Sequence, residues 1–313
     1  MVPPALLDRI ASLGRDLGRL FGAPRPGDTD PRQTEEWLLA AEAARQDGRH
    51  EEAVDLYRQV LRRRSADPTA LRGLRESAVV AGRLQDAVDA QQRVLALAAA
   101  TERAGEAELL ASLHHERARA ELDHDRPDVA IPHLKNALRT ARNFVPAALA
   151  LGDAHVLMGD PREAVRTWER ALEVGVSLPI LARLERAHRD EGRPTRMIAL
   201  YREALARAPE DLALAVSLGR VYLELEMLDE AADQLERVEA RAPDLPIVHA
   251  YLAAVFERRG DWREACAEYR RALQLGHAWD WPHRCDRCGA QAAGWQDRCA
   301  TCRRWNSLRP AQP

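Results

Sequence analysis

The chain has 313 residues, of which 46% are hydrophobic and 30% are charged, and its 46 basic and 49 acidic residues give a net charge of -3. This composition is typical of a globular protein and excludes a disordered polyelectrolyte. The near balance of charge gives no overall basic field of the kind that indicates nucleic acid as the main partner.

The cellular compartment follows from what the sequence lacks. No stretch approaches the roughly 18 uninterrupted apolar residues of a membrane span. The N-terminus also lacks the basic start and small-residue cleavage site of a signal peptide. We therefore expect a cytoplasmic protein with no transmembrane segment. In that reducing compartment, a group of cysteines is more typical of metal ligation or redox chemistry than of disulfides.

Residues 1–22 are predicted to form an amphipathic helix, because the large apolar residues of 3–22 share one helical face and the charges lie mostly opposite. Two interpretations stay open. The helix lies on a partner or on a membrane surface, which would make the protein peripheral to the inner membrane, or it covers the apolar edge of the next helices. Its small basic excess favours the second. Residues 23–33 mix Gly, Pro and Asp, and they are predicted to be a linker.

Residues 34–276 repeat with a period of about 34 residues. In each unit a small or apolar residue is followed four positions later by a larger one, and three positions further by Ala or Val. A glycine stands five residues before this motif in most units, which is typical of a helix that ends in a left-handed turn. An insertion of about nine residues near 96–110 breaks the phase once. The leading residues are Ala53, Ala87, Ala130, Ala164, Met197, Ala231 and Ala265.

These units resemble the tetratricopeptide repeat, whose first helix carries Leu-Gly and whose second carries Ala, an aromatic residue and Ala. Leu151-Gly152 and Leu218-Gly219 match the first part of that consensus. The sequence therefore predicts an all-α solenoid of about seven helix pairs, which stack because one pair cannot bury its own apolar face. Such solenoids bind proteins or peptides in a groove. The Lys/Asn/Arg set that holds a chaperone's C-terminal carboxylate is not at the corresponding positions, so a chaperone-tail adaptor is not expected.

The histidines give no sign of catalysis. We find no Ser/His/Asp or Cys/His constellation, no Gly-rich phosphate loop and no His-Glu-x-x-His motif. We therefore expect no enzyme. His114, His115 and His124 have no acidic or cysteine partner at ligand spacing, so a packing or surface role is favoured. Cys266 follows the small residue of the seventh unit, and we expect it to be a buried free thiol.

Residues 277–313 are predicted to form a metal module, because they hold the pattern C-x2-C-x10-C-x2-C. Two C-x2-C turns that face each other supply a closed set of four thiolates with no open position for a substrate. A dithiol redox pair is less consistent, because no βαβ unit surrounds the cysteines. One tetrathiolate-bound ion is expected, with Zn favoured over Fe by availability and Fe kept open. The metal ligands are predicted to be Cys285, Cys288, Cys299 and Cys302.

Two other residue types are concentrated in this module. Between residues 283 and 310, six arginines stand against two aspartates, and they would help to keep the thiolates ionised. The tryptophans Trp279, Trp281, Trp295 and Trp305 supply apolar mass, either around the metal or against the last repeat. We expect them to seat the module on the seventh repeat.

The tail resembles that of the lipopolysaccharide assembly protein B family, in which tetratricopeptide repeats precede a rubredoxin-like module. The matching residues are Arg284-Cys285, Cys288-Gly289, Cys299, Cys302, Trp305 and Leu308-Arg309-Pro310. The resemblance implies that the four cysteines bind the metal and that the module docks on the repeats. It also implies a non-catalytic adaptor at the cytoplasmic face of the inner membrane. There it would regulate lipid A synthesis through proteolysis of the committed-step deacetylase, with a membrane protease and a lipid A enzyme as partners.

Departures from that family keep alternatives open. Family members typically start with a transmembrane anchor, whereas this chain offers only the amphipathic segment 3–22. The second cysteine turn ends in Cys302-Arg303, where the family usually has Gly or Lys. One alternative is a nucleic-acid-associated adaptor that uses the Arg-rich zinc ribbon. Another is a rubredoxin-like electron carrier. The sequence does not name the bound partner, the groove residues or the oligomeric state.

Overall fold

The computed structural model describes residues 31–276 and 281–311. The predicted helix of residues 1–22 therefore lies outside the described residues, as does most of the predicted linker 23–33. Within the described ranges, no helix is long and apolar enough to cross a membrane.

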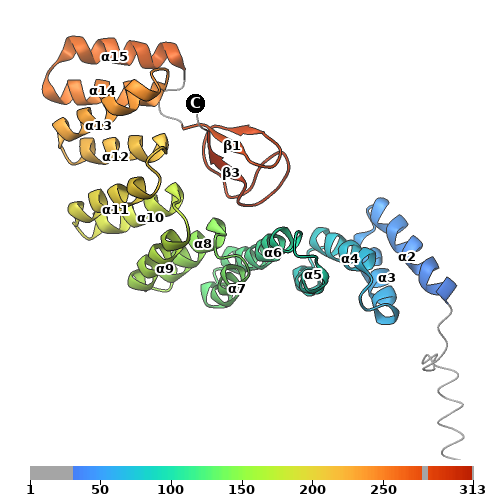
Figure 1. The fold of residues 1–313 in the computed structure, drawn as a ribbon. Coiled ribbons are helices and arrows are strands. Elements are labelled where there is room, and N and C mark those ends of the chain that lie inside the picture. Colours follow the sequence, from blue (N-terminus) through green and yellow to red (C-terminus); the bar gives the residue numbers. More distant parts are fainter. Residues whose placement is uncertain (1–30, 277–280, 312–313) are drawn as a thin grey trace, which may run out of the picture. The chain divides into compact units, whose positions relative to one another are not determined.

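Seven helix pairs account for most of the described chain, as the sequence predicts (Figure 1). The helices are α2 (Pro31–Gln46), α3 (His50–Arg63), α4 (Pro68–Val80), α5 (Leu84–Leu97), α6 (Arg103–Asp123), α7 (Pro127–Thr140), α8 (Val145–Leu157), α9 (Pro161–Val174), α10 (Leu178–Asp190), α11 (Pro194–Arg207), α12 (Leu212–Glu224), α13 (Leu228–Arg241), α14 (Pro246–Arg259) and α15 (Trp262–Leu275). The extra residues of the predicted insertion lengthen α6 to 21 residues and the loop before it.

The chain divides into two compact units. Residues 1–97 hold the first two pairs, α2 to α5, and residues 98–313 hold α6 to α15 together with the metal module. In the second unit, Figure 1 shows α8 to α14 curving around the strands of the module.

The turn inside each pair follows the predicted glycine chemistry. Gly260 ends α14 with φ 87°, in the left-handed region that glycine enters without steric penalty. The pairs α6/α7 and α12/α13 have no glycine there, and Asp125 and Glu226 take the same conformation with φ 55° and 58°. The turn geometry is thus kept where the residue type changes. The remaining turn glycines with positive φ are Gly48, Gly82, Gly159 and Gly192.

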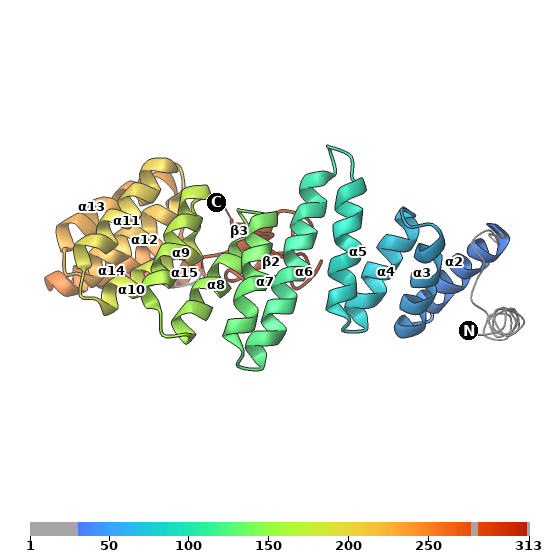
Figure 2. The ribbon, with the colours of Figure 1, turned by 90° about the horizontal axis from the view of Figure 1, so that it is seen from below.

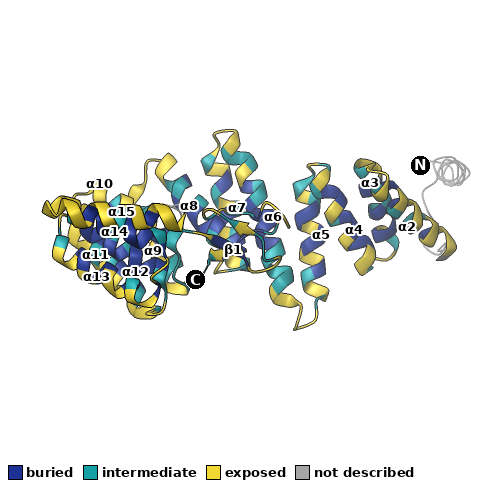
Figure 3. Ribbon diagram, turned by 90° about the horizontal axis from the view of Figure 1, so that it is seen from above, coloured by how far each residue is buried: buried dark blue, intermediate teal, exposed yellow. Residues whose placement is uncertain are grey.

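The motif residues form the contacts between helices. Ala53, Tyr57 and Val60 are all fully buried, and buried residues gather where paired helices face one another (Figure 3). A Cβ atom at Gly152 of α8 would lie 2.1 Å from the Trp168 ring of α9. The Leu-Gly pair of the first helix therefore leaves room for a large side chain of the second helix.

Arginines near the ends of the second helices connect consecutive repeats. Arg207 of α11 donates to the carbonyl oxygens of Leu172 and Glu173, at the end of α9, at 2.5 and 3.3 Å. Arg241 of α13 donates in the same way to the Pro209 carbonyl beyond α11, at 3.3 Å. The last carbonyls of a helix have no partner within the helix, and a cation is favourable beside them. These arginines therefore help to fix the stacking of neighbouring repeats.

The prediction that Cys266 is buried is wrong, because its thiol is exposed on α15. The corresponding residue one period earlier, Ala232 on α13, is only 3% exposed. In the described part of the chain, no further repeat follows α15, so the face that α13 buries is open on α15.

The metal module forms a three-stranded antiparallel sheet with strand order β2-β1-β3. Its strands are β1 (His283–Cys285), β2 (Gln291–Ala292) and β3 (Leu308–Pro310). Cys285 pairs with Leu308, which places the first cysteine beside the last strand. Seen from below, the sheet lies beside α6, α7 and α8 (Figure 2).

Candidate metal centre and docking surface

Two tight turns of the same type carry the four cysteines. In the first, the N–H of Gly289 donates to the Cys285 carbonyl at 3.0 Å, and the Cys285 N–H donates to the Ala290 carbonyl at 2.9 Å. In the second, Arg303 and Cys299 form the equivalent bond at 2.9 Å. The residue after the second cysteine of each turn has a positive φ, 73° at Gly289 and 55° at Arg303. The second turn thus keeps its shape although a non-glycine residue occupies the left-handed position.

These turns bring the four sulfur atoms together. Cys285 Sγ lies 3.7 Å from Cys302 Sγ, and Cys288 Sγ lies 3.7 Å from Cys299 Sγ. All four sulfurs lie within 4.8 Å of one another. Four thiolates at tetrahedral Zn–S distances of about 2.3 Å would be about 3.8 Å apart. The four cysteines therefore form a tetrathiolate metal-binding site.

In this crowded site, the pKa values of the Cys285 and Cys302 thiols shift in opposite directions. Burial raises the pKa of Cys285, but the hydrogen bond between Cys285 Sγ and Ser307 Oγ, which are 3.3 Å apart, lowers it. Hydrogen bonds from the backbone N–H groups of Arg287 and Cys288 also lower the pKa of Cys285, which falls to about 6. Cys302 receives a backbone hydrogen bond from Arg304 that lowers its pKa, but burial and the neighbouring sulfurs raise the pKa to about 12. Four thiolates at this spacing therefore need a cation between them.

The apolar core around the site is very small. Its fully buried members are Cys285, Cys299 and Leu308, with Trp295 partly buried against them. Because two of these three residues are metal-site cysteines, the module holds little apolar surface that could stabilise it without an ion.

Trp305 anchors the module on the third and fourth repeats. It is 5% exposed and belongs to a buried cluster with Phe144 and residues of α6 to α8. Its indole N–H donates to Glu116 of α6 at 2.8 Å. The His115 ring meets it edge-on at 4.7 Å, and the Arg119 guanidinium lies 5.5 Å from its centroid. A buried aromatic residue with a satisfied N–H is typical of an interface anchor.

Arginines of the module pair with carboxylates of α6. Arg287 lies 3.3 Å and Arg304 lies 3.7 Å from the Glu108 carboxylate. Arg298 lies 3.4 Å from Glu116. These arginines, which we expected to act mainly on the thiolates, therefore also dock the module. The sequence does not reveal Glu108 and Glu116, because neither differs in spacing or composition from the other helical glutamates.

The expected position of the module on the seventh repeat is wrong. Trp305 and Trp295 pack against clusters built from α6 to α10. Trp281 packs against the cluster that includes α12 and α14, so it contacts the later repeats. Trp279 lies outside the described residues. The curved array brings the returning chain to the middle of the second unit, which a linear sequence does not show.

His114 and His115 have the packing role that we expected, since they are 5% and 2% exposed on α6. One further histidine resembles a metal ligand in space: His249 lies between Glu239 and Glu268. Its Nδ1 is 2.6 Å from Glu268, its Nε2 is 2.7 Å from the Pro243 carbonyl, and Glu239 is paired with an arginine. These contacts explain why Glu239, His249 and Glu268 lie together: they link α13, α14 and α15 to one another.

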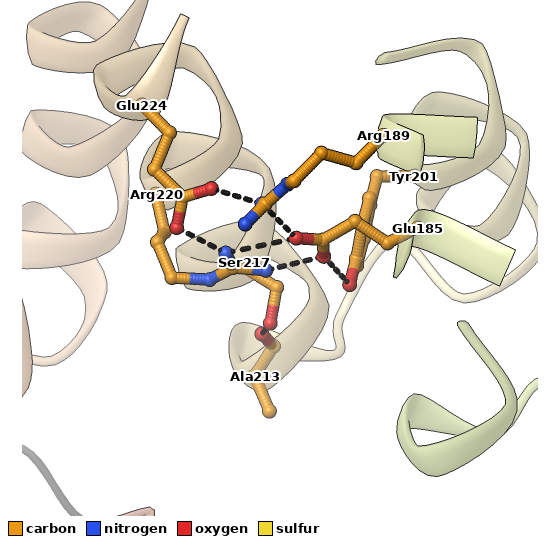
Figure 4. A network of polar contacts seen from close by, with 7 residues as sticks. All are labelled: Glu185, Arg189, Tyr201, Ala213, Ser217, Arg220 and Glu224. Atoms are coloured by element: carbon orange, nitrogen blue, oxygen red, sulfur yellow. Dashed lines mark hydrogen bonds and ion pairs between the residues drawn. The ribbon is translucent and has the colours of Figure 1, made fainter. Parts of the chain in front are cut away.

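A polar network crosses the first helices of two later repeats (Figure 4). Glu185 of α10 accepts hydrogen bonds from Tyr201 at 2.7 Å and from Arg220 of α12 at 2.5 Å. Burial raises the pKa of Glu185, but Arg220 and Tyr201 outweigh it and hold that pKa below its ordinary value. The more exposed Arg189 and Glu224 extend the network outward. The buried pair of Glu185 and Arg220 holds two neighbouring repeats together. The charged side chains of Arg189 and Glu224 remain at the surface.

The left-handed Arg303 gives a first prediction. Replacing Arg303 by glycine removes the steric penalty of φ 55°, so we expect Arg303→Gly to stabilise the module by about 1 kcal/mol. Gly289→Ala should have the opposite effect, because φ is 73°, a backbone conformation that residues with a Cβ atom rarely adopt. Chelator titration of the two purified variants measures the change. Equal or earlier metal loss from Arg303→Gly would contradict the prediction.

His115 gives a second prediction. Burial, together with Arg119, lowers the pKa of His115 to about 3, whereas an unfolded histidine titrates near pH 6.5. The unfolded state therefore binds the proton first as pH falls, and stability is lost below about pH 6.5. Between pH 6.5 and 5.5 the native protein should lose about 1 kcal/mol more than His115→Phe. Urea unfolding at both pH values measures this, with His124→Gln as the exposed control. Parallel losses in the native protein and His115→Phe would contradict the assignment.

Comparisons with known proteins agree with this architecture. A tetratricopeptide-repeat model matches residues 38–107, 115–172 and 149–211, a second such model matches 188–255, and a rubredoxin metal binding domain model matches 283–310. Cellulose synthase 2 operon protein C of Komagataeibacter xylinus is 32% identical over 119 residues, which is 34% of this chain and only 9% of that protein.

Solved tetratricopeptide-repeat structures are also similar. YrrB, described as having an unusual peptide-binding site, is 17% identical with a TM-score of 0.37, over 52% of this chain and 85% of its own. A repeat protein from Parabacteroides merdae is 15% identical with a TM-score of 0.36, over 79% and 94%. The chain belongs to the tetratricopeptide-repeat proteins, and a rubredoxin-like metal-binding domain follows its repeats, as in the lipopolysaccharide assembly protein B family.

Proposed function

We propose that this protein is a non-catalytic scaffold that regulates lipopolysaccharide synthesis by presenting a lipid A enzyme to a membrane protease. The observation that carries the scaffold role is the docking of the closed metal module on the repeats through Trp305. A closed four-thiolate set leaves the ion no open position for substrate, which supports a structural role. The lipopolysaccharide role rests on the likeness to the lipopolysaccharide assembly protein B family, which combines tetratricopeptide repeats with this rubredoxin-like domain. A cytoplasmic location at the inner membrane belongs to the same proposal.

We further propose that one zinc ion is held by Cys285, Cys288, Cys299 and Cys302. The sulfur separations of 3.7 Å suit a tetrahedral ion, and zinc needs no redox partner in a structural site. The ion would neutralise the crowded thiolates, while Trp305 and the arginines of the module hold the docked position.

Metal analysis of the purified chain tests this assignment. Native mass spectrometry of protein prepared without added metal should show one zinc ion per chain in a colourless sample. Cys285→Ser/Cys288→Ser should lose the ion. Cys266→Ser is the matched control and should keep it, because Cys266 is an exposed thiol on α15. A visible absorbance that disappears on reduction would identify tetrathiolate iron and contradict the zinc assignment.

The scaffold role is tested by affinity capture from a host that makes lipopolysaccharide. The native chain should retain a membrane protease and a lipid A biosynthesis enzyme. Cys285→Ser/Cys288→Ser should retain less of both, because loss of the ion releases Trp305 from the repeats. Cys266→Ser serves again as the control that changes a thiol without touching the metal site. If the native chain and the control capture neither protein, the lipopolysaccharide role is wrong.

A further inference from the structure

The outer face of α15 carries an apolar stripe that the structure leaves open. Trp262 is 65% exposed and Leu273 is 74% exposed. Between them, Cys266 is exposed and Tyr269 is half-buried. The four residues follow one another at positions i, i+4, i+7 and i+11, which lie on one side of a helix. This spacing is typical of a helix face that packs against a neighbouring helix.

The corresponding stripe one repeat earlier is covered. On α13, Ala232 is 3% exposed and Leu235 is fully buried, in a cluster that includes residues of α14. Where α13 has Glu239, α15 has Leu273, so the last helix is more apolar at this position than the helix inside the array. The terminal repeat of a solenoid normally has a polar outer face. The stripe on α15 therefore suits one more helix, in the place that α14 takes beside α13.

The sequence holds one segment with the signature of a first helix but no second helix after it. Ser12-Leu13-Gly14-Arg15 repeats the Ser217-Leu218-Gly219-Arg220 of α12, including the Leu-Gly pair of first helices. The following residues 22–30 include two prolines and two glycines, and α2 after them is itself the first helix of a pair. The segment thus lacks a second helix, and α15 lacks a following first helix.

The apolar residues of this segment have the same spacing as the stripe on α15. Leu6, Ile10, Leu13 and Leu17 again stand at i, i+4, i+7 and i+11. An antiparallel alignment, the usual one for successive helices joined by short turns, matches the two stripes along their whole length. It pairs Leu6 with Leu273, Ile10 with Tyr269, Leu13 with Cys266 and Leu17 with Trp262. In a helix, Asp8, Arg15 and Arg19 lie opposite the apolar stripe, so the added helix would present a polar outer face.

We propose that residues 3–22 of a second copy of this chain pack on the α15 stripe, so that copies associate head to tail. A second copy is the partner because the linker 23–30 spans at most about 28 Å. It leads to α2, which opens the first compact unit, whereas α15 is the last helix of the second. The contact joins two different surfaces, so each added copy leaves a further stripe open. The proposal rests on neither the zinc assignment nor the lipopolysaccharide role.

Two other ways of covering these surfaces are less favourable. A symmetric contact between two α15 helices would place Arg263 and Arg270 of both copies on the same side of the interface, where like charges repel. The segment covering α2 of its own chain would gain less apolar contact. Among the described residues of α2, Leu39 is the only large apolar side chain that is exposed.

Sedimentation velocity of the metal-loaded full chain between about 1 and 100 μM tests the proposal. The average mass should rise with concentration and exceed that of a dimer, because the contact does not close. Leu273→Glu and Leu13→Glu should each weaken association at least about tenfold, because a charge replaces an apolar contact. Leu157→Glu is the matched control. It makes the same change at a 64% exposed residue of α8, and it should associate like the native chain.

An equimolar mixture of the two stripe variants identifies the occupant. Leu273→Glu keeps residues 3–22 intact, and Leu13→Glu keeps α15 intact, so the mixture should form a complex with one copy of each and grow no further. Circular dichroism checks that both variants remain folded. The proposal is wrong if the native chain stays monomeric at about 100 μM, as it would if the segment covered α2, or if the mixture forms no complex. Self-association of Leu13→Glu alone would indicate the symmetric α15 contact and would equally overturn the proposal.

Discussion

The metal module has too little apolar surface to fold by itself, and this constraint determines how the second unit is built. Its buried cluster contains one leucine and two of the metal-site cysteines. Stability must therefore come from the ion on one side and from α6 to α8 on the other. The two sources are physically coupled, because Trp305 follows the last cysteine by only three residues. Whatever orders the second cysteine turn also places the indole ring that docks on the repeats.

The dependence is mutual. Trp305 is part of the same buried cluster as Phe144, Ala111 and Ala147, which belong to the third and fourth repeats. Undocking the module would expose this surface and leave His115 without the ring that covers it. Any ligand that binds only the docked form stabilises it in proportion to its occupancy. An ion held by the four cysteines would therefore be energetically linked to α6, α7 and α8 through the docked Trp305.

The sequence predicts the repeats and the metal site because both depend on local spacing. A period of 34 fixes which residues face one another, and two C-x2-C turns define four ligands wherever the module lies. The docking position depends instead on the curvature of the array and on individual ion pairs such as Arg287 with Glu108. Neither the curvature nor the individual ion pairs repeat with a regular period in the sequence. Cys266 shows the same limit. The corresponding position is buried on α13 inside the array, but it is exposed on α15, the last helix.

The polar network on α10 and α12 shows how charged groups are arranged on two neighbouring repeats. Glu185 and Arg220 are both more than three-quarters buried in their side chains, at 8% and 24% exposed. Separating such a pair leaves a charge without compensation, at a penalty of about 3–5 kcal/mol. A partner therefore gains little by competing for these two groups. Arg189 and Glu224, at 52% and 36% exposed, are the members that a partner can reach. Binding there would use charges that the buried pair already holds in position, so less conformational entropy is lost on association.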